Sequence, residues 1–294
     1  MALKLIISPA KKMRTVDGEP AATSRPIFLD EASRLADELG GLSYKQAKAL
    51  WRTSDALTGE NYDRTRTLSR DMQAEPAALT AAIVAYEGIQ YKHIAPDVMD
   101  SRQLEWIGRS LRIVSGLYGL LRPFDGVTPY RLEMQAPLSV GGARNLYEYW
   151  DSRPYDALCS ERDATAIVNL ASVEYAKAVL PHALPDGPPV VTCIFGSVRQ
   201  ADGKLVQRAT EAKAARGTFV RWCAERGVQE VQELSSFAER NYSFDEARSD
   251  DQTLVFVRPW PGSPAARHDA RRPGAMPGSP ARRPGTRPTR PAGR

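Results

Sequence analysis

The stretch LRIVSGLYGLLRPFD, residues 111–125, decides how the middle of the chain is arranged. Residues 111–114 form a short apolar run that ends in a loop, which is the pattern of a strand buried inside a sheet. Residues 166–168 repeat that pattern before the loop at 169–172. Gly116 and Gly119 would let the first loop approach a ligand closely. We therefore expect two buried strands, each followed by a loop suited to binding.

Strand-like and helix-like segments alternate on both sides of this stretch. The other expected strands are residues 3–8, 190–195, 204–208 and 254–258, with a hairpin turn near Asp202 and Gly203. The expected helices are residues 28–39, a segment that begins at Ser43, residues 76–88, a segment that ends near 111, and residues 173–180 and 211–225. This order predicts an α/β (mixed α+β) fold with a mixed sheet, in one compact unit over residues 1–258.

The last 36 residues differ from the rest in composition. Residues 259–294 contain 9 Pro, 5 Gly and 8 Arg but only one acidic residue, Asp269. Such a segment buries too little apolar surface to offset its ordering entropy, so we predict a disordered tail. The tail has a net charge of +7. The whole chain has a net charge of +5, so residues 1–258 together carry −2. The tail is either an inert extension or a non-specific nucleic-acid arm, and its charge says nothing about partners of the body.

Cysteine and histidine usage disfavours several classes of protein. The three cysteines lie 30 or more residues apart, and the three histidines show no metal-site spacing. We therefore expect no metal, no cofactor and no hydrolytic triad. The favoured interpretation is a non-enzymatic protein, although lysine-based chemistry stays open. With no apolar run of about 18 residues and no secretion signal, we expect a cytoplasmic protein and no membrane partner.

Residues 41–50, GLSYKQAKAL, are similar to a helix–hairpin–helix motif. In that motif a tight turn exposes backbone N–H groups that bind a phosphate oxygen of DNA without reading bases. Ser43 replaces the second glycine of the motif and forms a capping box with Gln46. The alternative is an ordinary pair of antiparallel helices. The predicted DNA-binding residues are Gly41, Leu42, Ser43, Lys45, Lys48 and Arg52.

Polar and basic residues follow the expected strands and border the long helix at 211–225. If the two strands of the opening stretch are neighbours, these side chains share one crevice at the strand ends. Lys213 and Arg216 lie beside the apolar stripe of the long helix, where a cation needs a carboxylate or a bound anion. The alternative is that Asp125, Glu133 and Glu174 neutralise them in structural pairs. The predicted anion-binding cleft comprises Lys11, Lys12, Ser115, Arg122, Arg131, Asn169, Ser172, Lys177, Lys213 and Arg216.

In these segments the chain resembles the YaaA family of bacterial peroxide-stress resistance proteins. The matching stretches are SPAKK at 8–12, VSGLYGLLRP at 114–123, PYRLEM at 129–134, NLASVEY at 169–175, AKAARG at 212–217 and VFVR at 255–258. The resemblance implies a cytoplasmic protein that limits free intracellular iron under peroxide stress. It also implies a mixed α/β fold with a helix–hairpin–helix element, a basic cleft and affinity for double-stranded DNA. Ala214 stands where the family usually has a second Lys, and Asp151 and Asn241 stand where it usually has Gly.

Three functions remain open after this comparison. The preferred one is a peroxide-stress protein that binds duplex DNA non-specifically through phosphates. The second is an enzyme or sensor for a small anionic or phosphorylated ligand, for which Arg122, Arg131, Lys177, Lys213 and Arg216 would have to converge on one cavity. The third is direct sequestration of iron by carboxylates such as Asp125, Glu133 and Glu174.

Overall fold

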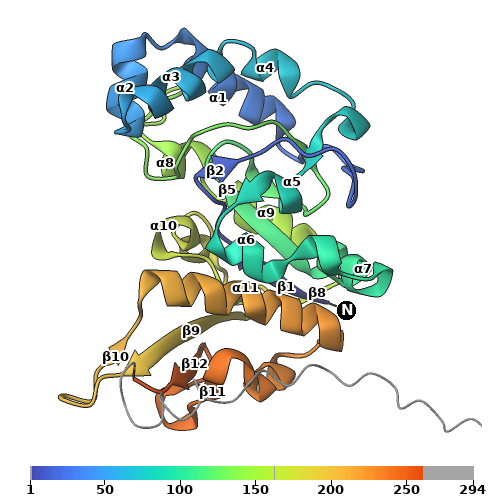
Figure 1. Ribbon diagram of the computed structural model, residues 1–294, viewed down its shortest axis with the longest axis vertical. Helices are drawn as coiled ribbons and strands as arrows, with labels where there is room; N and C mark the ends of the chain where they lie inside the picture. Colours follow the sequence, from blue (N-terminus) through green and yellow to red (C-terminus); the bar gives the residue numbers. More distant parts are fainter. Residues whose placement is uncertain (1, 162, 261–294) are drawn as a thin grey trace, which may run out of the picture.

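The computed structural model describes residues 2–161 and 163–260, so the predicted tail lies outside the described residues except for Pro259 and Trp260. At the centre is a mixed eight-stranded sheet (Figure 1). In spatial order its strands are β11 (Ser243–Phe244), β12 (Thr253–Arg258), β9 (Val190–Val198), β8 (Ala164–Asn169), β1 (Ala2–Ile7), β5 (Leu111–Ser115) and β6 (Gly119–Leu121), with β10 (Leu205–Val206) paired to β9. The run from β12 to β5 is parallel, whereas β6, β10 and β11 are antiparallel to their neighbours.

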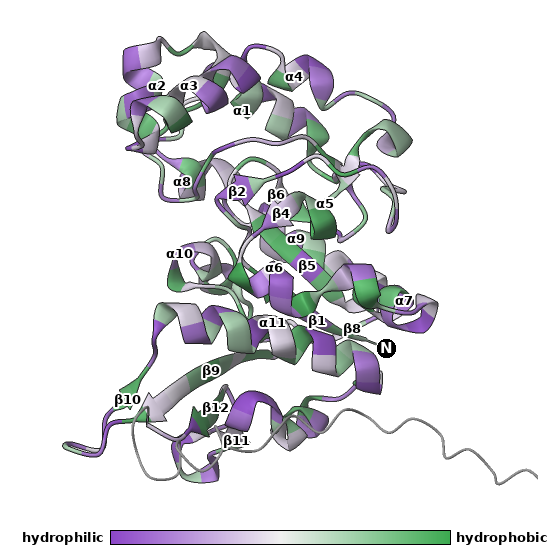
Figure 2. Cartoon of the chain, viewed as in Figure 1, coloured by the Kyte–Doolittle hydropathy of each residue, from purple (hydrophilic) through white to green (hydrophobic). Residues whose placement is uncertain are grey.

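The central strand β1 explains why the sheet is covered on both faces. All six of its residues are buried, and it pairs in parallel with β5 on one side and with β8 on the other. A strand of a parallel sheet that is buried on both faces reads as a continuous apolar run, and Figure 2 shows hydrophobic residues along β5 and β9 as well. Lys4 is the charged exception, and its ammonium forms ion pairs with Glu161 at 2.6 Å and Asp163 at 2.9 Å.

Helices surround the sheet and extend beyond one end of it (Figure 1). They are α1 (Leu29–Gly41), α2 (Tyr44–Trp51), α3 (Asp55–Thr65), α4 (Leu68–Asp71), α5 (Ala82–Ala85), α6 (Ile89–Ile94), α7 (Ser101–Ser110), α8 (Leu146–Trp150), α9 (Arg153–Ser160), α10 (Val173–Ala176) and α11 (Ala209–Arg226). Two short ribbons complete the fold, β2 (Lys12–Met13) with β4 (Tyr86–Glu87) and β3 (Thr80–Ala81) with β7 (Gly126–Val127). Helices α1 to α4 gather at the top of Figure 1, away from β9 and α11.

Helix α11 packs against β9 and along α6. Gly217 permits this close approach, since a Cβ atom there would lie 2.1 Å from the carbonyl oxygen of Gln90 and 2.8 Å from the Cβ atom of His93. The buried residues of α11 include Ala212, Ala215, Phe219 and Cys223, which are the four that helical spacing predicted. Arg216 follows Ala215 and is therefore held at the border between the core and the surface.

The predicted fold class is confirmed, and so are most long elements. The expected strands at 3–8, 111–114, 166–168 and 254–258 correspond to β1, β5, β8 and β12. The expected hairpin is formed by β9 and β10, and the predicted capping box of Ser43 and Gln46 is present at the start of α2.

One predicted helix is wrong, and another is shorter than predicted. Residues 76–88 contain a 3-10 turn, β3, the four-residue α5 and β4 instead of one helix. Residues 80–86 are all buried, and the backbone N–H groups of Ala82 and Ile83 donate to the carbonyl oxygens of Asp125 and Pro123. Tertiary hydrogen bonds therefore replace the helical ones. The helix expected at 173–180 ends at Ala176.

Candidate functional site

The C-terminal ends of β1 and β8 meet at the point where the strand order changes direction. The chain leaves β1 for β5 on one side, whereas β8, β9 and β12 are added on the other side. Crevices at such points are the usual ligand sites of open α/β sheets. Here Ser8 follows β1, and its Oγ accepts a hydrogen bond from the backbone N–H of Ser172 at 2.8 Å and donates one to the Oγ of Ser172 at 3.2 Å. These bonds fix the two strand-end loops against each other.

A cavity of about 390 Å³ opens at these strand ends, and we call it the strand-end pocket. Its walls come from the loop after β1, from α6, from the start of α10 and from α11. The lining residues that bear polar side chains are Ser8, Lys11, Lys12, Glu87, Gln90, Tyr91, Ser172, Glu174, Tyr175, Lys213 and Arg216. Tyr91 donates through its hydroxyl to the carbonyl oxygen of Ser8 at 3.0 Å, which secures the wall formed by α6.

Two donors of the strand-end pocket have no hydrogen-bond partner among the described residues. The Nε atom of Arg216 and the Nε2 atom of Gln90 are both buried and unpartnered. Gln90 as a residue is only 6% exposed. Burial lowers the pKa of the Arg216 guanidinium, and no carboxylate is among the groups that counteract this shift. A buried cation without a counter-charge is unfavourable, so this part of the pocket is suited to an anion.

The other charges of the strand-end pocket are largely matched. Lys12 pairs with Glu87 at 2.9 Å, and Lys11 pairs with Glu133 at 2.8 Å. Burial raises the pKa of the Glu174 carboxyl, whose Oε1 accepts a hydrogen bond from the backbone N–H of Gln135 at 3.3 Å. The free positive charge of the pocket therefore comes from α11.

A second cavity, also of about 390 Å³, lies between the end of α2 and the segment after β7; we call it the hairpin pocket. It is lined by Lys11, Leu50, Trp51, Arg52, Arg131, Glu133, Gln135, Ala136 and Pro137. Arg131 pairs with Glu133 at 3.0 Å, but its buried Nε has no partner among the described residues. The buried Nε1 of Trp51 is likewise unpartnered. Lys11 lines both cavities and so joins them.

The turn between α1 and α2 differs from an open phosphate-binding hairpin in one respect. The backbone N–H of Ser43 already donates to the Oε1 of Gln46 at 2.9 Å, and the Ser43 side chain caps Gln46 in return. Lys48 pairs with Asp55 at 2.5 Å, and its pKa is raised by that hydrogen bond. Lys45 and Arg52 are exposed, and so are Gly41 and Ser43, with Leu42 half-buried. Assignment as a helix–hairpin–helix element stays a prediction.

The expectation that Arg122, Arg131, Lys177, Lys213 and Arg216 converge on one cavity is wrong. Lys213 and Arg216 line the strand-end pocket, Arg131 lines the hairpin pocket, and Arg122 and Lys177 line neither. Arg122 instead pairs with the buried Asp125 at 3.0 Å and donates to the carbonyl oxygen of Arg25 at 2.7 Å. Lys177 is exposed on the last turn after α10. The structural-pair alternative therefore holds for Arg122.

The polar residues predicted at the strand ends have different roles. Asn169 lines neither pocket; its Oδ1 accepts from the backbone N–H of Ala171 at 3.0 Å and its Nδ2 donates to Thr192 at 3.3 Å. Ser115 is fully buried and shares a hydrogen bond of 2.7 Å with the hydroxyl of Tyr130. Ser172 lines the strand-end pocket, but it makes no side-chain cap on α10, which has only four residues. The predicted role of Ser172 in an anion-binding cleft stays a prediction.

Sequence reasoning missed Gln90, Trp51 and Tyr91. Gln90 was expected beyond the end of a helix that does not form, and an uncharged amide carries no local signal of its role. Trp51 and Tyr91 read as ordinary core residues, and the first is indeed only 6% exposed. Only the three-dimensional position of their polar atoms distinguishes them.

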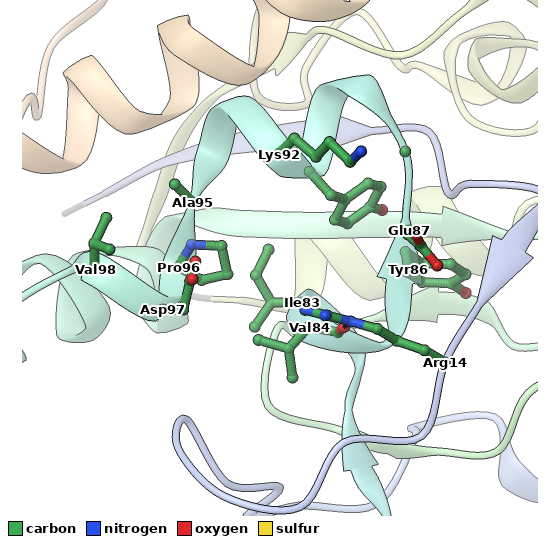
Figure 3. A pocket seen from close by; sticks show the side chains of 12 residues that line it. Arg14, Ile83, Val84, Tyr86, Glu87, Lys92, Ala95, Pro96, Asp97 and Val98 are labelled. Atoms are coloured by element: carbon green, nitrogen blue, oxygen red, sulfur yellow. Dashed lines mark hydrogen bonds between the residues drawn. The ribbon is translucent and has the colours of Figure 1, made fainter.

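A third cavity, of about 310 Å³, shares the lining residues Glu87, Gly88 and Tyr91 with the strand-end pocket (Figure 3). Figure 3 shows Arg14 extending beside Val84, and its Nε donates to the carbonyl oxygen of Val84 at 3.2 Å. Lys92, Glu87 and Asp97 also line this cavity, so charges of both signs are present. The described residues contain no group of three side chains able to hold a metal ion. None of the helices in the described ranges is long and apolar enough to cross a membrane.

Comparisons with known proteins agree on one family. A family model described as peroxide stress protein YaaA matches residues 3–248. A UPF0246 protein of Lactiplantibacillus plantarum is 44% identical over 255 residues, which cover 87% of this chain and 99% of the relative. UPF0246 proteins of Pediococcus pentosaceus and Desulfitobacterium hafniense are 43% and 40% identical, and each match covers 87% of this chain and 98% of the relative.

Proposed function

The chain belongs to the YaaA family of peroxide stress proteins, and from that premise we propose that it limits free intracellular iron and binds double-stranded DNA. Family membership supports the role in peroxide stress. The proposed DNA contact is non-specific, because it uses phosphate oxygens and not base edges. Together, less iron for hydroxyl-radical formation and a protein bound to the duplex would protect DNA from oxidation.

The observation that supports DNA binding best is the composition of the hairpin pocket. Lys11, Arg52 and Arg131 reach it from three separate segments of the chain, against a single acidic residue, Glu133. The Nε1 of Trp51 and the Nε of Arg131 add two donors that have no acceptor among the described residues. Phosphate oxygens accept such hydrogen bonds, and charged donors strengthen them. The exposed Lys45 extends the basic surface along α2.

The expected strength of this contact follows from the number of phosphates. Three contacts predict a log–log dependence of affinity on salt with a slope of about −2.7. The eight arginines of residues 259–294 could add a slope near −7 by the same rule. Lys48 contributes less than its position suggests, since Asp55 already neutralises it. The informative quantity is therefore the change in slope between variants of the full chain.

The test variant carries both Lys45→Glu and Arg52→Glu. It is compared with a control variant that carries the same change in net charge. Arg102→Glu with Lys204→Glu is suitable, because both residues are exposed and line neither pocket. Loss of two phosphate contacts should make the slope shallower by about 1.8 in the test variant only. Equal slopes for the test and control variants would refute the DNA contact at the hairpin.

The proposed effect on iron needs a cellular measurement. In cells exposed to hydrogen peroxide, chelator-accessible iron measured by electron paramagnetic resonance should be lower when the chain is present than when its gene is deleted. Equal iron signals in the two strains would contradict this part of the proposal. The Lys45 and Arg52 variant, tested in the same cells, shows whether the iron effect depends on the hairpin.

The second candidate, an enzyme or sensor for a small anionic ligand, loses the five-residue site expected for it, but one observation favours a smaller site. Arg216 reaches the strand-end pocket without a carboxylate partner among the described residues, although it is half-buried. Arg122 and Arg131, in contrast, are each paired with a carboxylate.

A further inference from the structure

We propose that the strand-end pocket binds a small phosphate-bearing anion, either inorganic phosphate or a phosphomonoester, through Arg216 and Gln90. Lys213 and the hydroxyl groups of Ser8 and Ser172 complete the site. This inference does not rest on DNA binding, since it concerns a different cavity from the hairpin pocket.

Arg216 carries a charge that no described carboxylate balances. Burial lowers the pKa of the Arg216 guanidinium, and the group that counteracts this shift is the thiol of Cys193. Burial raises the pKa of that thiol, so the thiol is neutral at physiological pH and supplies no negative charge. Arg216 therefore has no described negative charge to balance it. In other parts of the chain buried cations are balanced: Lys4 has two carboxylates, and Arg112 pairs with Glu161 at 2.5 Å. An anion bound in the pocket would give Arg216 the missing counter-charge.

Gln90 supplies a second unpartnered donor. The residue lines the same cavity, and its buried Nε2 has no partner among the described residues. Its backbone is fixed by α11, because the carbonyl oxygen of Gln90 lies against Gly217, the residue after Arg216. Two unsatisfied donors are thus held on adjacent helices by one helix contact. Leaving a buried donor unmade typically destabilises a protein by about 1–3 kcal/mol, so a pair of them in one cavity indicates an absent acceptor.

The unpartnered donors and the size of the cavity indicate which kind of ligand the pocket binds. The groups without partners are donors, and a guanidinium binds the oxygens of a phosphate in a bidentate manner. The cavity of about 390 Å³ lies at the lower end of the range for ligand pockets, so the ligand is small. Glu174 and Glu87 also line it, but Glu87 is paired with Lys12, and Glu174 accepts a hydrogen bond from the backbone N–H of Gln135. Among the described residues, neither carboxylate forms an ion pair with Lys213 or Arg216.

The experiment uses the full chain and two substitutions, Arg216→Met and Gln90→Met. Methionine matches the length of glutamine and replaces the apolar stem of arginine, and each substitution removes the unpartnered donor, so the free protein should stay folded and keep or gain thermal stability. The probe is inorganic phosphate, compared with chloride at equal ionic strength. The parent should be stabilised by phosphate, and each variant should bind phosphate about 10- to 100-fold more weakly in calorimetry. The control is Arg221→Met on the same helix, where the side chain pairs with Glu225 outside the cavity.

The arginine-rich residues 259–294 are identical in all four proteins, so any phosphate bound there cancels in the comparison. A second arm replaces phosphate with a nucleoside 5′-monophosphate. Tighter binding of the monophosphate identifies a phosphomonoester site, and tighter binding of phosphate identifies a site for the free ion. The proposal is overturned if phosphate stabilises the parent no more than chloride, or if both variants retain the parent affinity. The salt slope for DNA, measured on the same variants, separates this result from the DNA proposal.

Discussion

Asp151 ends helix α8 in a backbone conformation that strains any residue other than glycine. Its φ is 47° and its ψ is −136°. Such a conformation costs about 1–3 kcal/mol for a non-glycine residue. Glycine would lower the stability by about 0.4–1 kcal/mol through the entropy of the unfolded chain. We therefore expect Asp151→Gly to stabilise the protein by about 0.5–2 kcal/mol.

The lost side chain subtracts little from that gain. The carboxylate of Asp151 is 74% exposed and lies 4.0 Å from the Nδ1 of His182, and exposed pairs contribute about 0–1 kcal/mol. Urea unfolding at neutral pH measures the difference in free energy directly. Asn241→Gly is the matched control, since Asn241 also lies at positive φ (61°) but asparagine tolerates the left-handed region. A destabilised Asp151→Gly protein would refute the reasoning about backbone strain.

Two further predictions concern the packing of the sheet and of α11. Gly217→Ala should destabilise the chain by about 1–3 kcal/mol, because the added Cβ atom would meet the carbonyl oxygen of Gln90. Gly59→Ala in α3 is the control: no described atom lies within 4 Å of the added Cβ, so the same denaturant titration should show a neutral or stabilising effect. Although burial favours the neutral acid, hydrogen bonds from Arg112 and Lys4 hold the pKa of Glu161 below its usual value. The stability from this pKa shift is present above about pH 4.3 and is lost as the pH falls through the lower folded-state pKa, so urea midpoints should drop with acid, and a flat profile from pH 6 to pH 3 would contradict it.

The parts of the fold that the sequence predicts well are those with a one-sided pattern. Helix α1 buries Ala32, Leu35, Ala36 and Leu39 at helical spacing, and α2 begins with a capping box that is local by nature. The prediction of a helix at residues 76–88 is wrong because residues 80–86 are all buried and show no one-sided pattern. Their hydrogen bonds go to the loop near Asp125, which is far along the chain. Local periodicity contains no information about such partners.

The candidate site was predictable to a similar extent. The position of Arg216 beside an apolar stripe identified a cation that needs a partner, and in the structure no carboxylate among the described residues supplies one. The sequence could not show that Arg122 is already paired, since the burial of Asp125 depends on distant segments. It also could not show that Arg131 and Arg216 face different cavities. Which strand ends lie together is set by the order of the sheet, and that order is a property of the whole fold.

The most direct test of these conclusions is a crystal structure of the full chain grown with inorganic phosphate as the only multivalent anion. An oxyanion within hydrogen-bond distance of both the Arg216 guanidinium and the Nε2 of Gln90 is the predicted result. A strand-end pocket with no anion, and with Arg216 turned to a carboxylate of its own chain, would contradict the account.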